Sequence, residues 1–463
     1  MHAATAGGTT AERVAGWSPA WPIILAVLAR LVAWSFVPEG RFASDEESYV
    51  HAGINLLTRG EQDVFWPPFT GWLIAAAAWV FRTTDIRWIR GVWLAMDVAC
   101  VYMLGRLARY VALKSFGHGA RAKMVPTLAA GMYALYLPAI SFAQFATSET
   151  PAVLQTLGVL LLVVTAEPSL RSALAGGLVA GTLSLTRASL LPLIAIVPLA
   201  IAVQHRTPRA VRGAIVFAGV AGIVVGAVVI RNWRSTGTPT ISTNSAYNLY
   251  IGNGAFYAED LNLFQPRATA AQIEFRRQYF GGELAYPTAS PAELQREATE
   301  WIAAHPGEFA RRALGRLARV FAPKTDVLEL AGGEQRAGIF TPVSLTLLAL
   351  ANLQWALVLF VGLIGLAWLC RWQPAIGWMF AATVCGSVLL CLVAISKPRY
   401  AFVFEPLLII GAALVFSSPR ETLHGLGRRA GSIVAILSAF VLWGWAAWLI
   451  FSVSSRVALT NAS

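Results

Sequence analysis

The sequence predicts an all-α protein that crosses a membrane many times. Of its 463 residues, 57% are hydrophobic and only 13% are charged, and the mean hydropathy is +0.60. This composition is far more apolar than that of an ordinary soluble domain. The apolar residues also fall in runs of about 20, which is the length that a helix needs to cross a bilayer.

We expect about eleven spanning helices from these runs. The first, near residues 19–37, follows a polar leader, contains Arg30 and lacks a small-residue cleavage site, so it is interpreted as a retained signal anchor. No repeat or linker divides the chain, and residues 1–463 are expected to form one membrane-embedded unit. The other ten runs lie near residues 88–112, 124–146, 149–166, 171–187, 188–204, 211–230, 341–370, 374–395, 399–417 and 430–452.

A shorter apolar run over residues 66–82 begins with Pro67 and Pro68. If this run does not span, every strongly basic short loop falls on the side of the N-terminus, as expected for cytoplasmic loops. We therefore interpret it as an interfacial or re-entrant segment, with the N-terminus in the cytoplasm. The net charge of +12 belongs to these loops, so nucleic acid is not an expected partner. The loops cover residues 114–123, 204–212, 371–372 and 420–429.

The same arrangement places two longer polar stretches on the outer side, residues 38–87 and 231–340. In the second, Ser290 is expected to cap a helix that ends before Pro306, and Pro306 is expected to open another. Four arginines follow on one side of that helix, and we expect a solvated or headgroup-facing stripe, with binding of a substrate phosphate as the alternative. They are Arg311, Arg312, Arg316 and Arg319.

Three consecutive acids, Asp45, Glu46 and Glu47, directly follow the first apolar run. Ser44 with Glu47 three residues later is typical of a capping box, which predicts a short helix with Asp45 and Glu46 in its first turn. Because acids there interact well with the helix dipole, capping alone would explain them. The rest of the chain favours a functional role.

Other ionisable residues fall at the same expected outer depth, and such residues are functional candidates by default. Arg187 ends one apolar run, and Lys397 and Arg399 lie between two others. Glu149 and Arg231 complete the set. By contrast, Asp97 and Glu405 lie within apolar runs and are expected to be structural partners of cations.

These acids and bases suit transfer of a group from a lipid phosphate. Arginine or lysine can stabilise the charge that develops on a departing phosphate. A nearby carboxylate can take the proton of an attacking hydroxyl. A divalent cation held by the paired acids would assist the leaving group, although no His-rich or spaced carboxylate motif requires one.

An ordered set of short motifs resembles the bacterial protein-mannosyltransferase-like family, part of the GT-C superfamily of polyprenyl-phosphate-sugar-dependent glycosyltransferases that also holds the lipid A aminoarabinose transferases. The set runs in order through nearly the whole chain. It consists of Asp45-Glu46 with Tyr49, Pro67-Pro68, Leu185-Thr186-Arg187, Arg231-Asn232-Trp233, Ser242-Thr243-Asn244, the stretch from Asn248 to Asn253, and Lys397-Pro398-Arg399-Tyr400.

The resemblance implies a GT-C-type bundle with juxtamembrane helices in the first outer loop, and inverting transfer with Asp45 as the general base. Glu46 lies beside the base, and Glu149 matches a second acidic position that is often Asp in the family, so the expected catalytic residues are Asp45, Glu46 and Glu149. Arg187 and the pair Lys397 and Arg399 match positions that would hold the lipid phosphate. The expected substrate-binding residues are Tyr49, Arg187, Arg231, Asn244, Lys397, Arg399 and Tyr400.

The expected partners are a polyprenyl-phosphate sugar, a hydroxyl acceptor on a protein, glycan or lipid, and the bilayer. The expected location is the outer face of a bacterial cytoplasmic membrane. Two alternatives use the same charges. A transporter or flippase of a lipid-linked sugar would show charged groups along a path through the midplane, where only Asp97 and Arg30 are found. A non-catalytic scaffold in envelope assembly would need no acid at position 45.

The topology can be tested with a reporter fused after Gly117, in one of the basic loops. The reporter is expected on the cytoplasmic side, because basic short loops are retained there. A reporter found outside the cell would reverse every later loop and overturn this arrangement.

Overall fold

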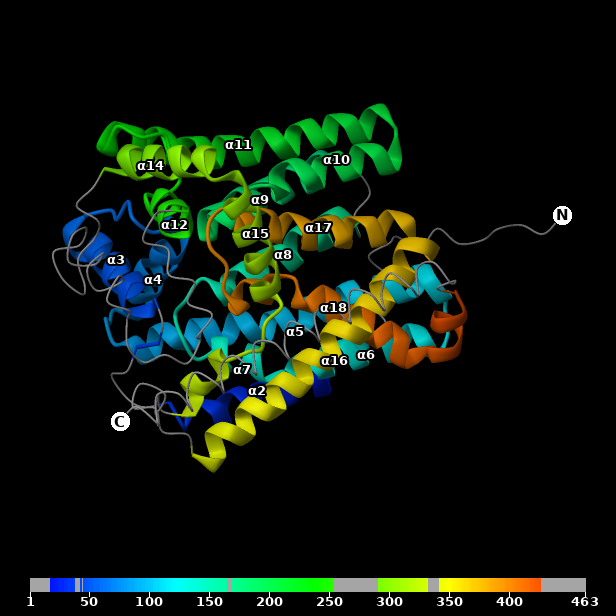
Figure 1. Cartoon of the computed structure of the whole chain (residues 1–463). Helices are drawn as coiled ribbons and strands as arrows, with labels where there is room; N and C mark the ends of the chain where they lie inside the picture. Colours follow the sequence, from blue (N-terminus) through cyan, green and yellow to red (C-terminus); the bar gives the residue numbers. More distant parts are fainter. Residues whose placement is uncertain are drawn as a thin grey trace.

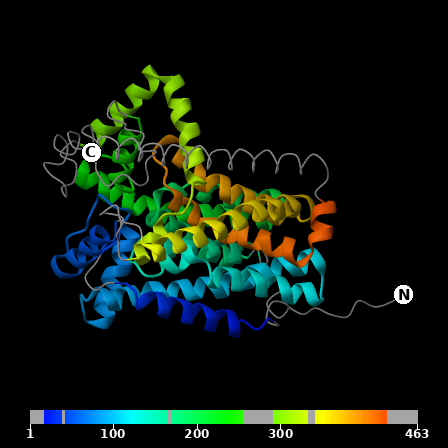
Figure 2. The same ribbon diagram turned by 60° about the horizontal axis from the view of Figure 1, so that its bottom comes forward.

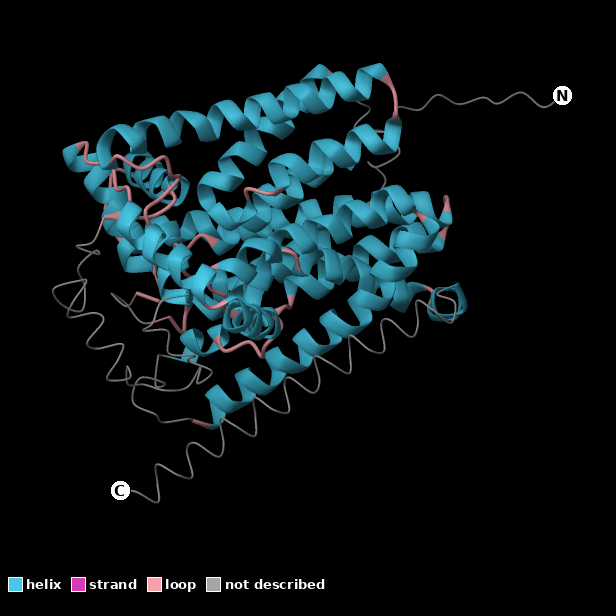
Figure 3. Ribbon diagram, turned by 45° about the horizontal axis from the view of Figure 1, so that its top comes forward, coloured by secondary structure: helices cyan, strands magenta, loops and turns pink. Residues whose placement is uncertain are grey.

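A computed structural model of the chain describes residues 17–37, 42–43, 45–164, 169–253, 290–331 and 341–425. Within these ranges the chain forms helices joined by loops, and no strand is found there (Figure 3). The predicted all-α class is confirmed. The run at residues 430–452 lies outside the described residues.

The helices follow the apolar runs closely. The first half contains α2 (Ala20–Trp34), α3 (Glu46–Arg59), α4 (Pro68–Phe81), α5 (Ile86–Phe116), α6 (Ala120–Ala134), α7 (Leu137–Phe142), α8 (Glu149–Val164), α9 (Leu170–Thr186), the 3-10 turn η1 (Ala188–Leu190), α10 (Leu193–His205) and α11 (Pro208–Thr236). The second half contains α12 (Asn244–Asn253), α14 (Pro291–Ala304), α15 (Pro306–Val320), η2 (Asp326–Ala331), α16 (Pro342–Trp372), α17 (Pro374–Val393), η4 (Pro398–Val403) and α18 (Glu405–Ser417).

Two expected spans are divided. The run at 124–146 breaks between α6 and α7, where Tyr136 adopts an extended backbone and Pro138 starts the next helix. The run at 399–417 begins as η4 and becomes α-helical only at Glu405. In both places a proline lies in the first turn of the new element, which suits a helix start better than a helix interior.

Among the described helices, α5, α11, α16 and α17 are long and apolar enough to cross a membrane. Shorter apolar helices accompany them: α2, α4, α8, α18 and the stretch Ala188–Val203. The expected number of eleven spans stays a prediction, as does the interfacial placement of residues 66–82, which form α4.

The long helices lie side by side in one bundle (Figure 1). Their outer surface is apolar: on α11, the exposed fractions of Ile215, Ile223 and Ile230 are 66%, 73% and 50%. A surface of this kind is unfavourable in water and favourable against lipid. The chain is therefore a multi-pass membrane protein.

The turns α5–α6, α10–α11 and α16–α17 lie at one end of the bundle, and α3, α4 and α12 lie at the other (Figure 1). Side-chain contacts join the basic loops at the first end. The Gln373 Nε2 atom donates to the Lys114 carbonyl at 2.7 Å, and Arg121 pairs with Glu421 at 2.6 Å. The prediction that these basic loops share one side is confirmed, while the identity of that side stays a prediction.

Close helix contacts and buried ion pairs hold the bundle together. A Cβ atom at Gly365 of α16 would overlap the carbonyl of Gly411 on α18, so glycine allows these helices to approach. Arg30 on α2 pairs with Asp97 on α5 at 2.6 Å, and both side chains are fully buried. The Tyr133 hydroxyl donates to Asp97 at 3.0 Å. The prediction that Asp97 is a structural partner of a cation is confirmed.

Replacing Asp97 with alanine leaves Arg30 charged and buried without its carboxylate. We expect a loss of about 3–5 kcal/mol in the free energy of unfolding, seen as a large drop in melting temperature in detergent. Glu421→Ala breaks an ion pair whose side chains are 43% and 53% exposed, and should leave the melting temperature nearly unchanged. Equal melting temperatures for the two variants would contradict the structural role of Asp97.

Candidate active site

A cavity of about 470 Å³ opens at the end of the bundle where α3, α4 and α12 lie. Its lining comes from segments far apart in the chain: the starts of α3 and α8, the junction of α9 with η1, α11, α12, the end of α17, and η4. Helix termini and loops meet here, so polar side chains can face one space without interrupting a spanning helix. Asp45, Glu149, Arg187 and Arg399 all line it.

These four side chains form a chain of alternating charges. Arg399 Nη2 contacts Asp45 Oδ2, and Arg399 Nε lies 3.5 Å from Glu149 Oε1. The same Glu149 oxygen accepts from Arg187 Nη1 at 2.9 Å. The Arg187 guanidinium also lies 4.8 Å from the centre of the Tyr400 ring. Two acids and two bases thus neutralise one another in the resting cavity.

The environment of Asp45 favours its ionised form. Burial by itself would raise the pKa of Asp45, but the charges of Arg399, Lys397 and Arg187 outweigh it and lower the pKa to about 2. The charge of Arg399 lowers the pKa of Lys397. Asp45 is therefore a carboxylate at neutral pH, with 27% of its side chain exposed.

A buried ion pair behind Asp45 fixes the start of α3. Both carboxylate oxygens of Glu46 accept from Arg90 of α5 at 2.8 Å. The backbone amides of Ala146 and Ala43 donate to the same carboxylate at 2.7 and 3.1 Å. The Glu46 side chain is fully buried, does not line the cavity, and positions its neighbour Asp45.

The predicted capping box rests on Ser44 and therefore stays a prediction. Asp45 is the N-cap of α3, and its side chain makes no capping hydrogen bond. Ser44 lies outside the described residues. Among the described residues, the Glu46 carboxylate accepts a backbone amide near this helix start, and Arg90 of α5 holds it there.

A second buried ion pair lies behind Arg399. Lys324 pairs with Glu405 at 2.5 Å and donates to the Pro398 carbonyl at 2.7 Å. Its ammonium lies 4.2 Å from the centre of the Trp355 ring. The prediction that Glu405 is a structural partner of a cation is confirmed, and this partner holds the backbone that carries Arg399.

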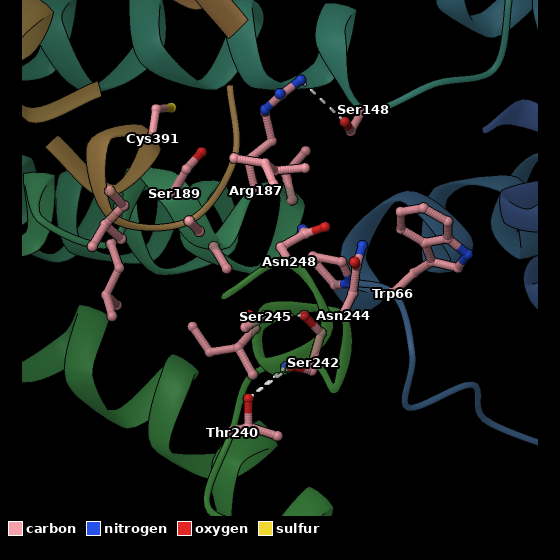
Figure 4. A pocket seen from close by; sticks show the side chains of 18 of the residues that line it. Trp66, Ser148, Arg187, Ser189, Thr240, Ser242, Asn244, Ser245, Asn248 and Cys391 are labelled. Atoms are coloured by element: carbon pink, nitrogen blue, oxygen red, sulfur yellow. Dashed lines mark hydrogen bonds between the residues drawn. The ribbon is translucent and has the colours of Figure 1, made fainter. Parts of the chain in front are cut away.

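The cavity has a polar side and an apolar side. Figure 4 shows Asn244 and Asn248 of α12 facing the space that also receives Arg187, which donates to Ser148 at 3.3 Å. Val225 and Val229 of α11 and Leu390 of α17 provide the apolar lining. An amphiphile with a charged head and a hydrocarbon tail fits such a division.

Most of the predicted site residues meet in this cavity. Its lining includes Asp45, Tyr49, Glu149, Arg187, Asn244, Arg399 and Tyr400. Arg231 is absent from the lining, and its guanidinium donates to the neighbouring Asn232 side chain at 2.9 Å. Lys397 is exposed beside the cavity. The structure therefore does not bring Glu46, Arg231 or Lys397 into the lining.

Several lining residues were not predicted. Ser148 directly precedes Glu149 at the start of α8, and Thr186 directly precedes Arg187 at the end of α9. Their position at a helix end, next to a charged candidate residue, is the sequence signal that could have identified them. Trp66 comes directly before the double proline that begins α4. Asn248 lies four residues after Asn244, one turn along the same face of α12.

The expected solvated arginine stripe on α15 is only partly correct. Arg311 is exposed, but Arg312 and Arg316 are buried, with exposed fractions of 8% and 1%. Arg316 donates to the Leu392 carbonyl at 2.6 Å and to Asn253 Oδ1 at 2.8 Å. Helix α15 packs against α17 (Figure 2). Through these hydrogen bonds, Arg316 joins α12 to the end of α17 beside the cavity.

No three His, Cys, Asp or Glu side chains in the described ranges converge to form a cation site. Asp45 and Glu149 each contact a guanidinium, and those charges would repel a metal ion. The residues in this arrangement do not fit a metal ion.

Comparison of the sequence with protein-family models and with curated proteins gives no match. Solved structures with an overall likeness include the Archaeoglobus fulgidus oligosaccharyltransferase AglB in complex with an inhibitory peptide and a dolichol-phosphate, at 13% identity and a TM-score of 0.45, covering 94% of this chain and 56% of that one. The apo form of the oligosaccharyltransferase of the same organism shows 14% sequence identity and a TM-score of 0.47. The match covers 92% of this chain and 54% of that one. This chain thus spans about half of their length. Values this low define neither a family nor an activity.

Neighbouring acids provide a matched test of the support behind Asp45. Glu46→Gln removes the charge that pairs with buried Arg90, and we expect a destabilisation of about 3–5 kcal/mol, measured as a fall in melting temperature in detergent. Glu47→Gln makes the same change on an exposed side chain and should be neutral. Similar melting temperatures for both variants would show that Glu46 does not hold α3 in place.

Proposed function

We propose that this protein is a membrane glycosyltransferase that moves a sugar from a polyprenyl-phosphate donor to an acceptor hydroxyl. The observation that carries the proposal is the meeting of Asp45 with Arg399, Glu149 and Arg187 in one cavity that also has an apolar side. Such a cavity offers a carboxylate base, cations for a phosphate, and lining suited to an isoprenoid tail.

In the proposed reaction, Asp45 takes the proton from the acceptor hydroxyl. The acceptor oxygen attacks the anomeric carbon of the sugar and forms the new glycosidic bond. The bond from that carbon to the phosphate oxygen breaks, and its electron pair leaves with polyprenyl phosphate. Attack from the face opposite to the leaving group inverts the anomeric configuration.

The arginines of the cavity stabilise the departing phosphate. Arg187 and Arg399 supply guanidinium donors, which suit the oxygens of a phosphate better than a point charge does. Glu149 lies between them and contacts both, so we assign it the role of holding the two guanidinium groups rather than that of a base. Asn244 and Asn248 face the same space and can bind sugar hydroxyls.

The proposed tail of the donor lies along Val225, Val229 and Leu390, at the apolar side of the cavity. We place the cavity at the outer face of a bacterial cytoplasmic membrane, because the basic loops cluster at the opposite end of the bundle. A transporter is less well supported. Arg30 and Asp97, the charges expected near the midplane, are fully buried and paired with each other, so they do not line a path.

The base assignment predicts that Asp45→Asn lowers the rate of sugar transfer by about 10²–10⁴-fold while the protein still inserts and folds. The rate is measured as release of polyprenyl phosphate by purified protein from a panel of lipid-phosphate sugars, with an acceptor extract present. Glu61→Gln, which changes an exposed acid of the same outer loop, is the control and should keep full activity. Near-normal turnover by the Asp45 variant would refute the assignment.

A further inference from the structure

We propose that the donor phosphate itself releases the catalytic base, by displacing Asp45 from Arg399. The lipid phosphate must then bind before an acceptor hydroxyl can be deprotonated, and the reaction is ordered with the donor first. This inference rests on the proposed function and adds an order of binding and a reason for phosphate specificity.

The first step of the argument is that Arg399 is already occupied. Its Nη2 atom contacts Asp45, and its Nε atom lies 3.5 Å from Glu149. A phosphate entering the cavity needs these same guanidinium donors. A phosphate that binds at Nη2 takes the place of the Asp45 carboxylate.

The two carboxylates are not equally held. Glu149 is 2% exposed and also accepts from Arg187 at 2.9 Å, so its displacement would leave a buried acid beside a single cation. Asp45 is 27% exposed and lies at the N-cap of α3, where water can solvate its carboxylate once it is released. Displacing a buried charge from its partner costs far more than displacing a partly exposed one. Asp45 is therefore the acid that gives way.

Release from Arg399 makes Asp45 a stronger base. Its pKa of about 2 is held down mainly by the charge of Arg399, and a bound phosphate would neutralise that charge. The pKa of Asp45 then rises toward the ordinary carboxyl range, where proton transfer from a hydroxyl is more favourable. The ionisable groups that face Asp45 are Arg399, Tyr400 and Lys397 around η4, Arg187 at the end of α9, Glu149 on α8 and Tyr49 on α3.

The exchange also selects the donor class. A neutral glycoside cannot replace a carboxylate on Arg399, so it leaves Asp45 paired. A sugar attached to a lipid phosphate brings the anion that the exchange requires. The same contact that suppresses the base in the empty cavity thus discriminates between phosphate-linked and neutral sugars.

The direct test measures binding of farnesyl phosphate, an isoprenyl phosphate that carries no sugar, to the full-length protein in detergent. If Asp45 competes with phosphate for Arg399, then Asp45→Asn should tighten binding about tenfold. The same change in an Arg399→Gln background should have little effect, because the contested cation is absent. Glu61→Gln controls for the loss of one negative charge in the outer loop.

If the Asp45→Asn variant binds farnesyl phosphate as strongly as the wild type or more weakly, phosphate does not displace Asp45 from Arg399 and the inference is overturned. Equal tightening in the Arg399→Gln background also overturns it, because the effect would then be general repulsion between Asp45 and the ligand. Turnover separates this inference from the proposed function. A variant that loses transfer but binds farnesyl phosphate normally leaves Asp45 as the base and rejects the exchange, whereas a variant that keeps transfer rejects the base assignment.

The wild-type protein offers a second test that needs no folded variant. Values of kcat/KM for the donor report the free enzyme, and kcat reports the occupied one. In the pH profile of kcat/KM, the decrease at low pH that protonation of Asp45 causes should be absent down to about pH 4. In the pH profile of kcat, this decrease should appear near the ordinary carboxyl pKa of about 4. Coincident decreases in the two profiles would show that donor binding does not change the pKa of Asp45.

Discussion

The structure around the cavity depends on the pairing of charges that have been removed from water. The contact between Asp45 and Arg399 joins segments separated by more than three hundred residues. Each partner lies next in the chain to a residue that takes part in, or is bound by, a buried ion pair. Glu46, next to Asp45, is bound by Arg90 of α5, and the carbonyl of Pro398, next to Arg399, is bound by Lys324 with its partner Glu405. A buried charge without its partner is strongly destabilising, so these pairs keep both ends of the contact between Asp45 and Arg399 in place.

The same constraint distinguishes two uses of charge in this protein. Arg30 and Asp97 are fully buried and hold α2 against α5. Asp45 and Arg399 form their contact at the edge of a cavity, where a ligand can reach them. Charges of the first kind stabilise the bundle, and those of the second kind are available for chemistry. The apolar lining from α11 and α17 completes the cavity in which we propose that a lipid tail and a phosphate bind together.

Much of the fold and part of the site could be predicted from local sequence. Helix positions followed from apolar runs, with errors mainly at prolines such as Pro138, where a run continued but the backbone did not. Asp45, Glu149, Arg187 and Arg399 were recognised as charged residues at expected helix ends. Part of the arginine stripe was wrong, and the buried position of Glu46 behind the cavity was missed, for one reason. Whether Glu46 or Arg316 is solvated depends on which distant helix packs over it, and local spacing carries no information about that neighbour.

The sequence by itself determined a polytopic helical protein with its basic loops on one side, because bilayer thickness and the cost of burying charge act on each segment separately. It also supplied the acids and bases from which a site could be built. Only the tertiary structure decided that Asp45 contacts Arg399, that Glu46 supports the site from behind, and that Arg231 stays outside the cavity lining. These outcomes depend on ion pairs between residues far apart in the chain, and such pairs form only when the packed helices bring their ends together.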